Sequence, residues 1–301
     1  MVLGGRVAGH NQGVRMSDHR RGSEPVVRAD KPKAAGGKAY HLDTKPGSLA
    51  ARCLLVGSPE RAKMIGTKMI DGTRVGNHRG LVSYTGKWQE VPVSVVTTGM
   101  GSASTAIVLP EAVASGARAF IRVGSCGALW REVELGDALI CTAAVRLDGA
   151  SDNWAPIGFP AVADYRVVAA LKRAATNLNV RHHVGIGATT TCFNEGQARP
   201  DQSGYIPQRL WDQHRELVAR GVLFYSMEEA TLFTWCATHG GYPCGAVDAT
   251  YANRITNAFG VTGDRVAAEI TLDALVALDP DELFREQPLR ETVTLPSLPP
   301  T

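Results

Sequence analysis

The sequence predicts an α/β fold, in which a single domain holds a β-sheet with helices on its flanks. Between residues 40 and 278, short apolar runs alternate with longer amphipathic runs, which is the pattern of strands joined by crossover helices. Several of the short runs are apolar and β-branched throughout, as strands are when both of their faces are covered. Because no internal repeat or linker interrupts this span, one domain fits better than two.

The expected elements alternate along the chain. The short apolar runs predict strands at Cys53–Val56, Val91–Thr97, Ala119–Val123, Ala138–Ala144, Val184–Thr190 and Cys244–Ala249. The amphipathic runs predict helices at Glu60–Met69, Ala103–Ser115, Tyr165–Leu178, Pro207–Arg220, Met227–His239 and Thr262–Ala277.

The two ends of the chain differ in composition from this span. Residues 1–38 are rich in glycine and arginine and lack the apolar segment of a secretory signal. They predict a disordered leader, with a basic transit or interaction arm as the alternative. Prolines recur from position 280 onward, and proline blocks helix continuation, so residues 280–301 are expected to form an irregular tail. The folded domain is expected over residues 39–279.

Composition excludes several classes of protein. The formal net charge is only +3, which argues against a dedicated nucleic-acid binder. No apolar run approaches the roughly 20 residues of a membrane-spanning helix. The six cysteines form no CxxC pair and have no histidine at metal-ligand spacing, so no metal site is expected. They are interpreted as small buried thiols of a cytoplasmic protein; a nucleophilic Cys126 or Cys192 would lack an evident base beside it.

Glycine-rich polar segments stand at the carboxyl ends of predicted strands, where ligands bind in α/β sheets. They read VGSPER (56–61), TTGMGS (97–102), RVGSCG (122–127), TTTCFNEGQAR (189–199) and YANR (251–254). One such turn is weak evidence, because glycine marks any tight turn. Their recurrence at successive strand ends predicts a ligand site at that edge of the sheet.

Two of these segments predict an anion site. Gly57 allows close approach of the backbone before a helix N-terminus, which attracts anions, and Arg61 offers a fork of donors to the same anion. Arg122 and the hydroxyl of Ser125 repeat the arrangement. Each arginine can instead be a surface ion-pair partner, and for Arg79 taken alone we prefer that interpretation. Walker, dinucleotide and nucleophile-elbow motifs are absent from the sequence, so the expected anion is free phosphate or a small ester.

The chain resembles the uridine phosphorylases of the nucleoside phosphorylase family across residues 40–278. The resemblance rests on VGSPER, NHR, TGMGSAST, RVGSCGA, VRLDGAS, FPAVADY, FNEGQAR, MEEATLF and the NR pair at 253–254, in this order. It implies a central mixed, twisted β-sheet. It also implies a pentosyltransferase that converts uridine and phosphate to uracil and ribose 1-phosphate without a covalent intermediate, with phosphate as co-substrate and no cofactor. At least a homodimer is implied, and the family suggests a hexamer.

The resemblance also assigns roles to individual residues. The phosphate-binding set comprises Gly57, Arg61, Arg122, Ser125 and, from a neighbouring subunit, Arg79. The base-binding set comprises Phe193, Gln197, Arg199 and Arg254. The ribose-binding set comprises Met227, Glu228 and, from the partner, His41. Arg199, Gln197 and Arg122 are the expected catalytic residues. An amide matches the edge of uracil, and an arginine can stabilise negative charge on the leaving base.

Several of these residues have simpler interpretations. Glu228 can complement the dipole of a helix N-terminus, Met227 can be core packing, and His41 can be an exposed residue of the leader. Asn253 stands where purine-cleaving relatives have an aspartate, which argues against purine cleavage. Asp248 is expected to be structural or paired in the interior.

The sequence departs from the family at Ser226, where a glutamate is usual, at Tyr251, where a small aliphatic residue is usual, and at Gly80, where some members have a cation-binding glutamate. The first two departures leave open a preference for a uridine altered at the base or the 5′ position. A nucleosidase that uses water, and a nucleoside-binding protein without turnover, are the remaining alternatives.

Overall fold

The computed structural model describes residues 29–285, and those from Lys33 onward belong to one compact unit. Its strands are β1 (Arg52–Val56), β2 (Ile70–His78), β3 (Leu81–Trp88), β4 (Val91–Thr97), β5 (Ala119–Ala128), β6 (Ala138–Leu147), β7 (Ala161–Val162), β8 (His182–Thr190), β9 (Phe224–Ser226), β10 (Cys244–Asn253) and β11 (Ala258–Phe259). Its helices are α1 (Pro59–Gly66), α2 (Ser102–Ala114), α3 (Tyr165–Asn177), α4 (Gln208–Ala219), α5 (Glu229–Thr238), α6 (Asp264–Val276) and α7 (Pro280–Arg285), with 3-10 turns η1 (Ala35–Gly37), η2 (Ser151–Asn153) and η3 (Glu195–Gln197).

The predicted α/β fold with a mixed sheet is confirmed, and each predicted strand and helix is present. Strands β5 and β10 run further than predicted, so RVGSCG and the first three residues of YANR lie on these strands, and Arg254 follows β10 directly. The predicted irregular tail is wrong at its start, because Pro280–Arg285 forms helix α7; proline is tolerated in the first turn of a helix, where its missing N–H is not needed. Residues 286–301 and most of the predicted leader lie outside the described residues.

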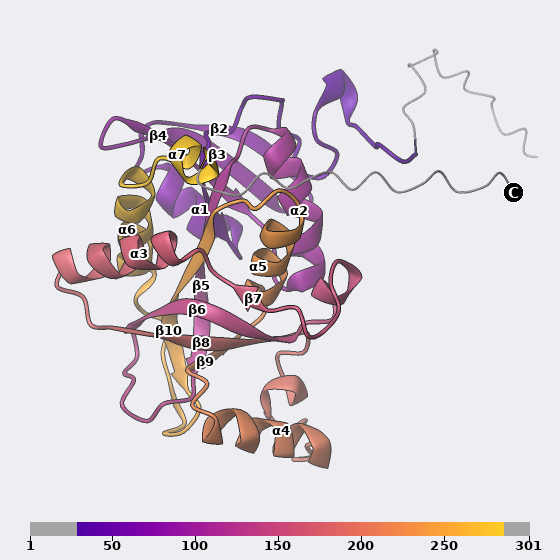
Figure 1. Cartoon of the computed structure of the whole chain (residues 1–301), viewed down its shortest axis with the longest axis vertical. Coiled ribbons are helices and arrows are strands. Elements are labelled where there is room, and N and C mark those ends of the chain that lie inside the picture. Colours follow the sequence, from indigo (N-terminus) through magenta and orange to yellow (C-terminus); the bar gives the residue numbers. More distant parts are fainter. Residues whose placement is uncertain (1–28, 286–301) are drawn as a thin grey trace, which may run out of the picture. The chain divides into compact units, whose positions relative to one another are not determined.

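The strands form one mixed sheet in the order β11-β10-β6-β8-β9-β5-β1-β4-β3-β2. β5 runs parallel to β1 and β10 and antiparallel to β9. Because β10 pairs with both β6 and β5, the strands β5, β10, β6, β8 and β9 close into a ring. Figure 1 shows β5 and β10 running side by side through the centre of the ribbon, with β6, β8 and β9 crossing near their lower half.

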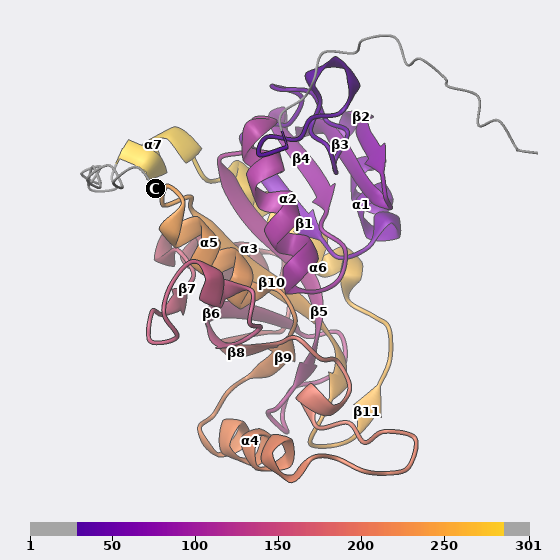
Figure 2. The ribbon, with the colours of Figure 1, turned by 90° about the vertical axis from the view of Figure 1, so that its right-hand side faces the viewer.

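Two hydrophobic cores cover the two faces of the sheet. One core joins α2 and α5 to the sheet through residues such as Leu109, Leu232 and Phe233. The other joins α1, α3 and α6 to the opposite face through residues such as Ile65 and Leu171. Figures 1 and 2 show α5 and α2 on one side of the strands and α3 and α6 on the other, with α4 apart at the lower end. Within residues 29–285, no helix is long and apolar enough to cross a membrane.

Candidate active site

The candidate site lies where the strand that pairs with β5 changes from β1 to β9. β1 pairs with β5 up to the Val56–Val123 register, and β9 pairs with it only from Gly127. Between them, within the described chain, residues 124–126 have a strand neighbour only on the β10 side. A change of strand neighbour leaves a crevice at the carboxyl ends of the flanking strands. This crevice explains why the predicted ligand-binding segments converge here.

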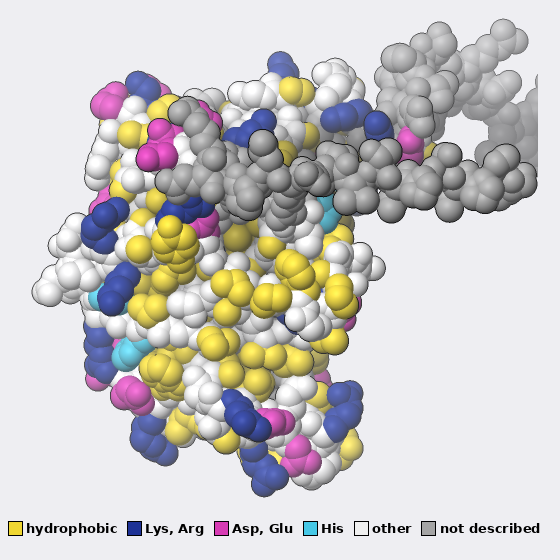
Figure 3. Space-filling model, in the orientation of Figure 1, with side chains coloured by type: hydrophobic (Ala, Val, Ile, Leu, Met, Phe, Trp, Pro, Cys, Tyr) yellow, Lys and Arg dark blue, Asp and Glu magenta, His cyan; other side chains and the backbone are white. Residues whose placement is uncertain are grey.

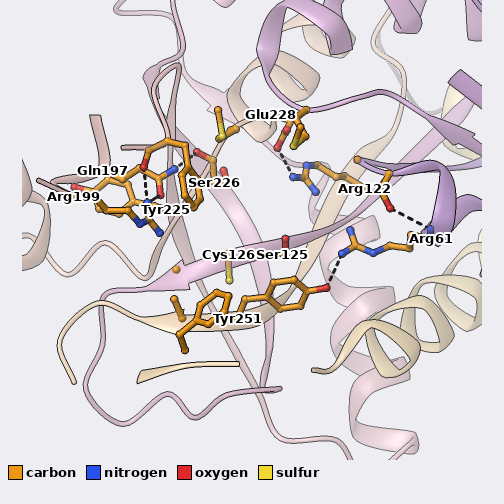
Figure 4. A pocket seen from close by; sticks show the side chains of 18 residues that line it. Arg61, Arg122, Ser125, Cys126, Gln197, Arg199, Tyr225, Ser226, Glu228 and Tyr251 are labelled. Atoms are coloured by element: carbon orange, nitrogen blue, oxygen red, sulfur yellow. Dashed lines mark hydrogen bonds and ion pairs between the residues drawn. The ribbon is translucent and has the colours of Figure 1, made fainter. Parts of the chain in front are cut away.

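A cavity of about 350 Å³ occupies this crevice. Figure 4 shows its side chains pointing inward from both ends. Its lining includes nine of the residues predicted to bind substrate: Gly57, Arg61, Arg122, Ser125, Phe193, Gln197, Arg199, Met227 and Glu228. It also includes Tyr251 and Ser226, two positions at which the sequence was expected to differ from the family. The volume falls within the usual range of a small-molecule site.

Arg61 enters one end of the cavity from the first turns of α1. The Ser58 side chain caps this helix by accepting from the Arg61 backbone N–H at 3.2 Å, and Pro59 takes the first helical position. The guanidinium donates to the Val123 carbonyl at 3.1 Å and pairs with Asp264 at 2.8 Å. Asp264 was not foreseen from the sequence, because an acidic residue in the first turn of a helix is ordinary dipole complementation.

Tyr251 links Arg61 to Asp264 at this end of the cavity. Its hydroxyl accepts from Arg61 Nη2 at 3.1 Å and donates to Asp264 Oδ2 at 2.6 Å. The register between β10 and β5 shifts between Thr250 and Ala252, and such a bulge redirects the residue it contains. Tyr251 therefore contacts the predicted phosphate-binding arginine.

Arg122 lies deeper, on β5, with its side chain only 9% exposed. Glu228 pairs closely with Nη2, Glu229 lies 3.3 Å from Nε, and Asp248 lies 3.4 Å from Nη1. These three carboxylates hold the pKa of Arg122 above its usual value, although burial opposes them. Asp248 is thus paired in the interior, as the sequence predicted, whereas the involvement of Glu229 gave no sequence signal apart from its place beside Glu228.

Glu228 and Met227 line the cavity from the turn that begins α5. Glu228 Oε1 accepts from the Gly101 backbone N–H at 2.6 Å, and the Met227 carbonyl accepts from Ser102 Oγ at 2.8 Å. These bonds join the α5 turn to the TTGMGS segment before α2. The two predicted ribose contacts therefore both line the cavity, and Glu228 lies against Arg122.

Gln197 and Arg199 form the other end, on the loop around η3. Gln197 is buried, and its Nε2 donates to Thr190 Oγ1 at 3.1 Å while its Oε1 accepts from Arg199 Nη1 at 2.7 Å. The same Arg199 nitrogen donates to the Phe193 carbonyl at 2.6 Å, and its guanidinium carbon lies 3.8 Å from the centroid of the Phe193 ring. The amide and guanidinium therefore present a fixed array of polar atoms beside an aromatic ring.

Arg254 holds the backbone of this loop through two hydrogen bonds. It does not line the cavity; it donates to the carbonyls of Gln197 and Ala198 at 3.0 and 3.2 Å. Ala198 has a φ of 53°, in the left-handed region that L-residues rarely adopt, so Arg254 fixes a strained turn. Burial, followed by repulsion from Arg254, lowers the pKa of Arg199 to about 10, which leaves Arg199 cationic at neutral pH.

His41 and Arg79 lie together outside the cavity. Both contact Tyr40: the His41 and Tyr40 rings meet edge to face at 4.9 Å between centroids, and Arg79 lies 5.5 Å over the Tyr40 ring. Arg79 and Gly80 both have positive φ, 52° and 79°, as in the tight turn of a two-residue hairpin. This turn between β2 and β3 exposes Arg79, while His41 Nδ1 lies 2.8 Å from Glu111.

The geometry bears on three questions from the sequence: the role of Asn253, a cysteine nucleophile and a metal site. Asn253 donates through Nδ2 to the Val133 carbonyl at 2.7 Å and accepts on Oδ1 from two backbone N–H groups, so it secures a turn. Burial raises the pKa of the Cys126 thiol well above its usual value, which opposes a thiolate nucleophile. Among residues 29–285, no group of three or more histidine, cysteine or acidic side chains is arranged to hold a metal ion.

Comparison with known proteins agrees with this geometry. A family model described as the phosphorylase superfamily matches residues 51–274. A uridine phosphorylase of Thermococcus kodakarensis is 42% identical over 255 residues, which cover 85% of this chain and 92% of the relative. Uridine phosphorylases of Klebsiella aerogenes and Escherichia coli are 38% and 37% identical over 218 residues, 71% of this chain and 86% of each relative. The chain belongs to the phosphorylase superfamily.

Proposed function

We propose that this protein is a uridine phosphorylase, a pentosyltransferase that converts uridine and phosphate to uracil and ribose 1-phosphate. The observation that carries the proposal is the order of groups along one cavity. Arg61, Arg122 and Ser125 stand toward one end, with Glu228 against Arg122, and Gln197 with Arg199 stands at the other end. The names of the similar proteins support the same substrate. The geometry offers no observation in favour of a modified uridine.

The charges suit the reaction. As the bond between C1′ and N1 breaks, its electron pair moves to the base, and positive charge develops on the sugar. Arg199, cationic at neutral pH, would stabilise the uracil anion. A phosphate oxygen held near Arg122 and Ser125 would form the new bond to C1′, and the uracil anion would then take a proton from solvent. Glu228 would accept hydrogen bonds from the vicinal ribose hydroxyls.

We also propose that the working enzyme is a homo-oligomer, at least a dimer and by family resemblance a hexamer. His41 and Arg79 gather around one aromatic ring away from the cavity of their own subunit, as two residues do when one surface supplies both to a neighbour. Hydrophobic side chains spread over the middle of the face seen in Figure 3, and exposed apolar surface of that kind favours association. The free cysteines support a reducing, cytoplasmic location.

A phosphate-dependence assay tests the function. The full-length protein is incubated with uridine, thymidine, 5′-modified uridines and inosine, with and without phosphate, and ribose 1-phosphate is measured by mass spectrometry. Phosphate-dependent release of uracil, with uridine preferred over inosine, supports the proposal. Uracil release without phosphate indicates a nucleosidase, and ligand binding without turnover indicates a binding protein; both outcomes contradict the proposal.

Mixed oligomers test the shared site. Arg79→Ala and Arg199→Ala are each expected to lose activity. When the two inactive variants are unfolded, mixed and refolded, hybrid dimers contain one intact site, which restores about a quarter of the original activity if subunits pair at random. Refolded wild-type protein provides the reference. A mixture as inactive as its components would refute the shared site.

A further inference from the structure

Two buried carboxylic acids behind Arg122 have no role in the reaction described above. Glu229, at the start of α5, and Asp248, on β10, have fully buried side chains. Each approaches a different nitrogen of Arg122, at 3.3 Å from Nε and 3.4 Å from Nη1. Glu228 contacts the third nitrogen, Nη2, so each of the three carboxylates contacts a different nitrogen of the guanidinium.

The hydrogen bonding of this pair is incomplete if both groups are ionised. Ser226 Oγ donates to Glu229 Oε2. Within the described residues, Glu229 Oε1 and Asp248 Oδ2 have no hydrogen-bond partner, and the contact of Oε1 with Arg122 Nε at 3.3 Å is an ion pair only. The two carboxyl groups contact the same buried guanidinium, at 3.3 and 3.4 Å, and burial, followed by repulsion from Asp248, raises the pKa of Glu229. A buried acceptor without a donor is costly, and two adjacent carboxylates satisfy each other only when one of them carries a proton.

The charges around Arg122 also favour a proton on one of the two buried acids. Arg122 supplies one positive charge, and Glu228, Glu229 and Asp248 would supply three negative charges if all were ionised. The resulting excess of two negative charges would repel a phosphate dianion from the predicted site. One proton retained by the buried pair removes half of this excess and leaves Arg122 better able to attract the anion.

We propose that Glu229 and Asp248 share a single proton and act as a positioning pair, which fixes the Arg122 guanidinium for phosphate while adding one negative charge beside it instead of two. The backbone makes room for the pair, because a Cβ at Gly124 would lie 1.7 Å from Arg122 Nη1 and 1.9 Å from Asp248 Oδ1. The effect on phosphate rests on the proposed function, whereas the shared proton itself does not.

Loss of the shared proton should weaken phosphate binding as pH rises. Burial is the largest cause that raises the pKa of Glu229 well above its usual value, and repulsion from Asp248 adds to it. The charged or titratable groups that face the pair are Arg122, Glu228, Arg61, Cys126 and Cys141. Burial keeps both of these thiols protonated, so the pair itself is the group that should titrate behind Arg122.

The test compares full-length wild type with Glu229→Gln, which keeps the size of the side chain and removes its titration. Glu216→Gln, on the exposed side of α4, is the matched control. The first readout is the infrared absorption of a protonated carboxylic acid at neutral pH, expected in wild type and lost in Glu229→Gln. This measurement does not depend on enzymatic activity.

The second readout is the KM for phosphate from neutral to alkaline pH. Phosphate's own ionisation cancels in the ratio of wild-type KM to Glu229→Gln KM. We expect that ratio to rise by up to about tenfold per pH unit above the pKa of the pair, and the ratio to the control to stay flat. If Glu229→Gln fails to fold, Asp248→Asn carries the same expectation.

A constant KM ratio, or a wild-type spectrum without the acid band, overturns the proposal. A wild type that shows no phosphorolysis refutes the proposed function instead, and the infrared band then still decides whether the proton is shared.

Discussion

Replacing Arg199 with alanine should remove the cationic donor that the leaving base requires. In the structure its Nη1 donates to the Phe193 carbonyl at 2.6 Å and to Gln197 Oε1 at 2.7 Å, and its guanidinium stacks on the Phe193 ring at 3.8 Å. The arginine is therefore held before substrate arrives, and it retains its charge at neutral pH because its pKa falls only to about 10.

The size of the effect follows from these contacts. Removing one preorganised donor that stabilises developing charge costs about 10²–10³ in rate, or roughly 3–4 kcal/mol. Arg199 also fixes the orientation of the Gln197 amide, because it occupies Oε1 while Thr190 Oγ1 accepts from Nε2. Alanine therefore frees the amide to rotate, and we expect the preference for uridine over other nucleosides to fall together with kcat/KM.

The assay measures kcat/KM for uridine, thymidine and inosine at saturating phosphate in Arg199→Ala and Arg199→Lys. Lysine keeps the charge without the planar fork, so it should recover only part of the loss. Arg209→Ala, at an exposed position of α4, controls for removal of an arginine. Uridine turnover equal to wild type in Arg199→Ala, or an unchanged order of nucleosides, would refute the base-site assignment.

The other predictions concern the phosphate end. Gly124→Ala should abolish phosphate binding and lower the melting temperature, because its Cβ would collide with Arg122, whereas Gly158→Ala meets no atom within 4 Å and should match wild type in both measurements. Asp264→Asn should lower the KM for phosphate by about two- to fivefold, the effect of a partly exposed charge; a raised KM would show that this carboxylate positions its arginine rather than competing with phosphate. Burial raises the pKa of Glu229 in the folded state. Its contribution to the stability of the fold is therefore fully present below the unfolded pKa of about 4.3 and is lost as pH rises through the folded pKa. Urea unfolding at several pH values should show the free energy of unfolding of wild type falling by up to about 1.4 kcal/mol per pH unit relative to that of Glu229→Gln. The same dependence of this free energy on pH in both proteins would contradict the prediction.

The sequence predicted the long elements because their hydrophobic patterns are strong. It missed the β2–β3 hairpin, since β2 is largely exposed and carries glycine, aspartate and asparagine. β9 was also missed, because a strand of three residues leaves no periodic signal. The closing of the ring through β9 and β10 depends on pairing between distant segments, which local pattern does not encode.

The site was predictable where motifs stand at strand ends, as with Arg61 on α1 and Gln197 on the η3 loop. The partners of those residues were not predictable. Asp264 follows Arg61 by about two hundred residues, and only folding brings its carboxylate to 2.8 Å. Arg254 was expected at the base, and no sequence pattern indicated that it also braces the backbone of the loop through the carbonyls of Gln197 and Ala198.

These partners change how phosphate attraction must arise. Arg61 is paired with Asp264, and Arg122 faces Glu228 together with the buried acid pair. Neither arginine therefore offers an uncompensated charge to a dianion. Within one subunit, the remaining attraction comes from the N-terminus of α1 and the hydroxyl of Ser125. A phosphate site of useful affinity needs one further cation, and exposed Arg79 on its hairpin turn is suited to provide it across an interface.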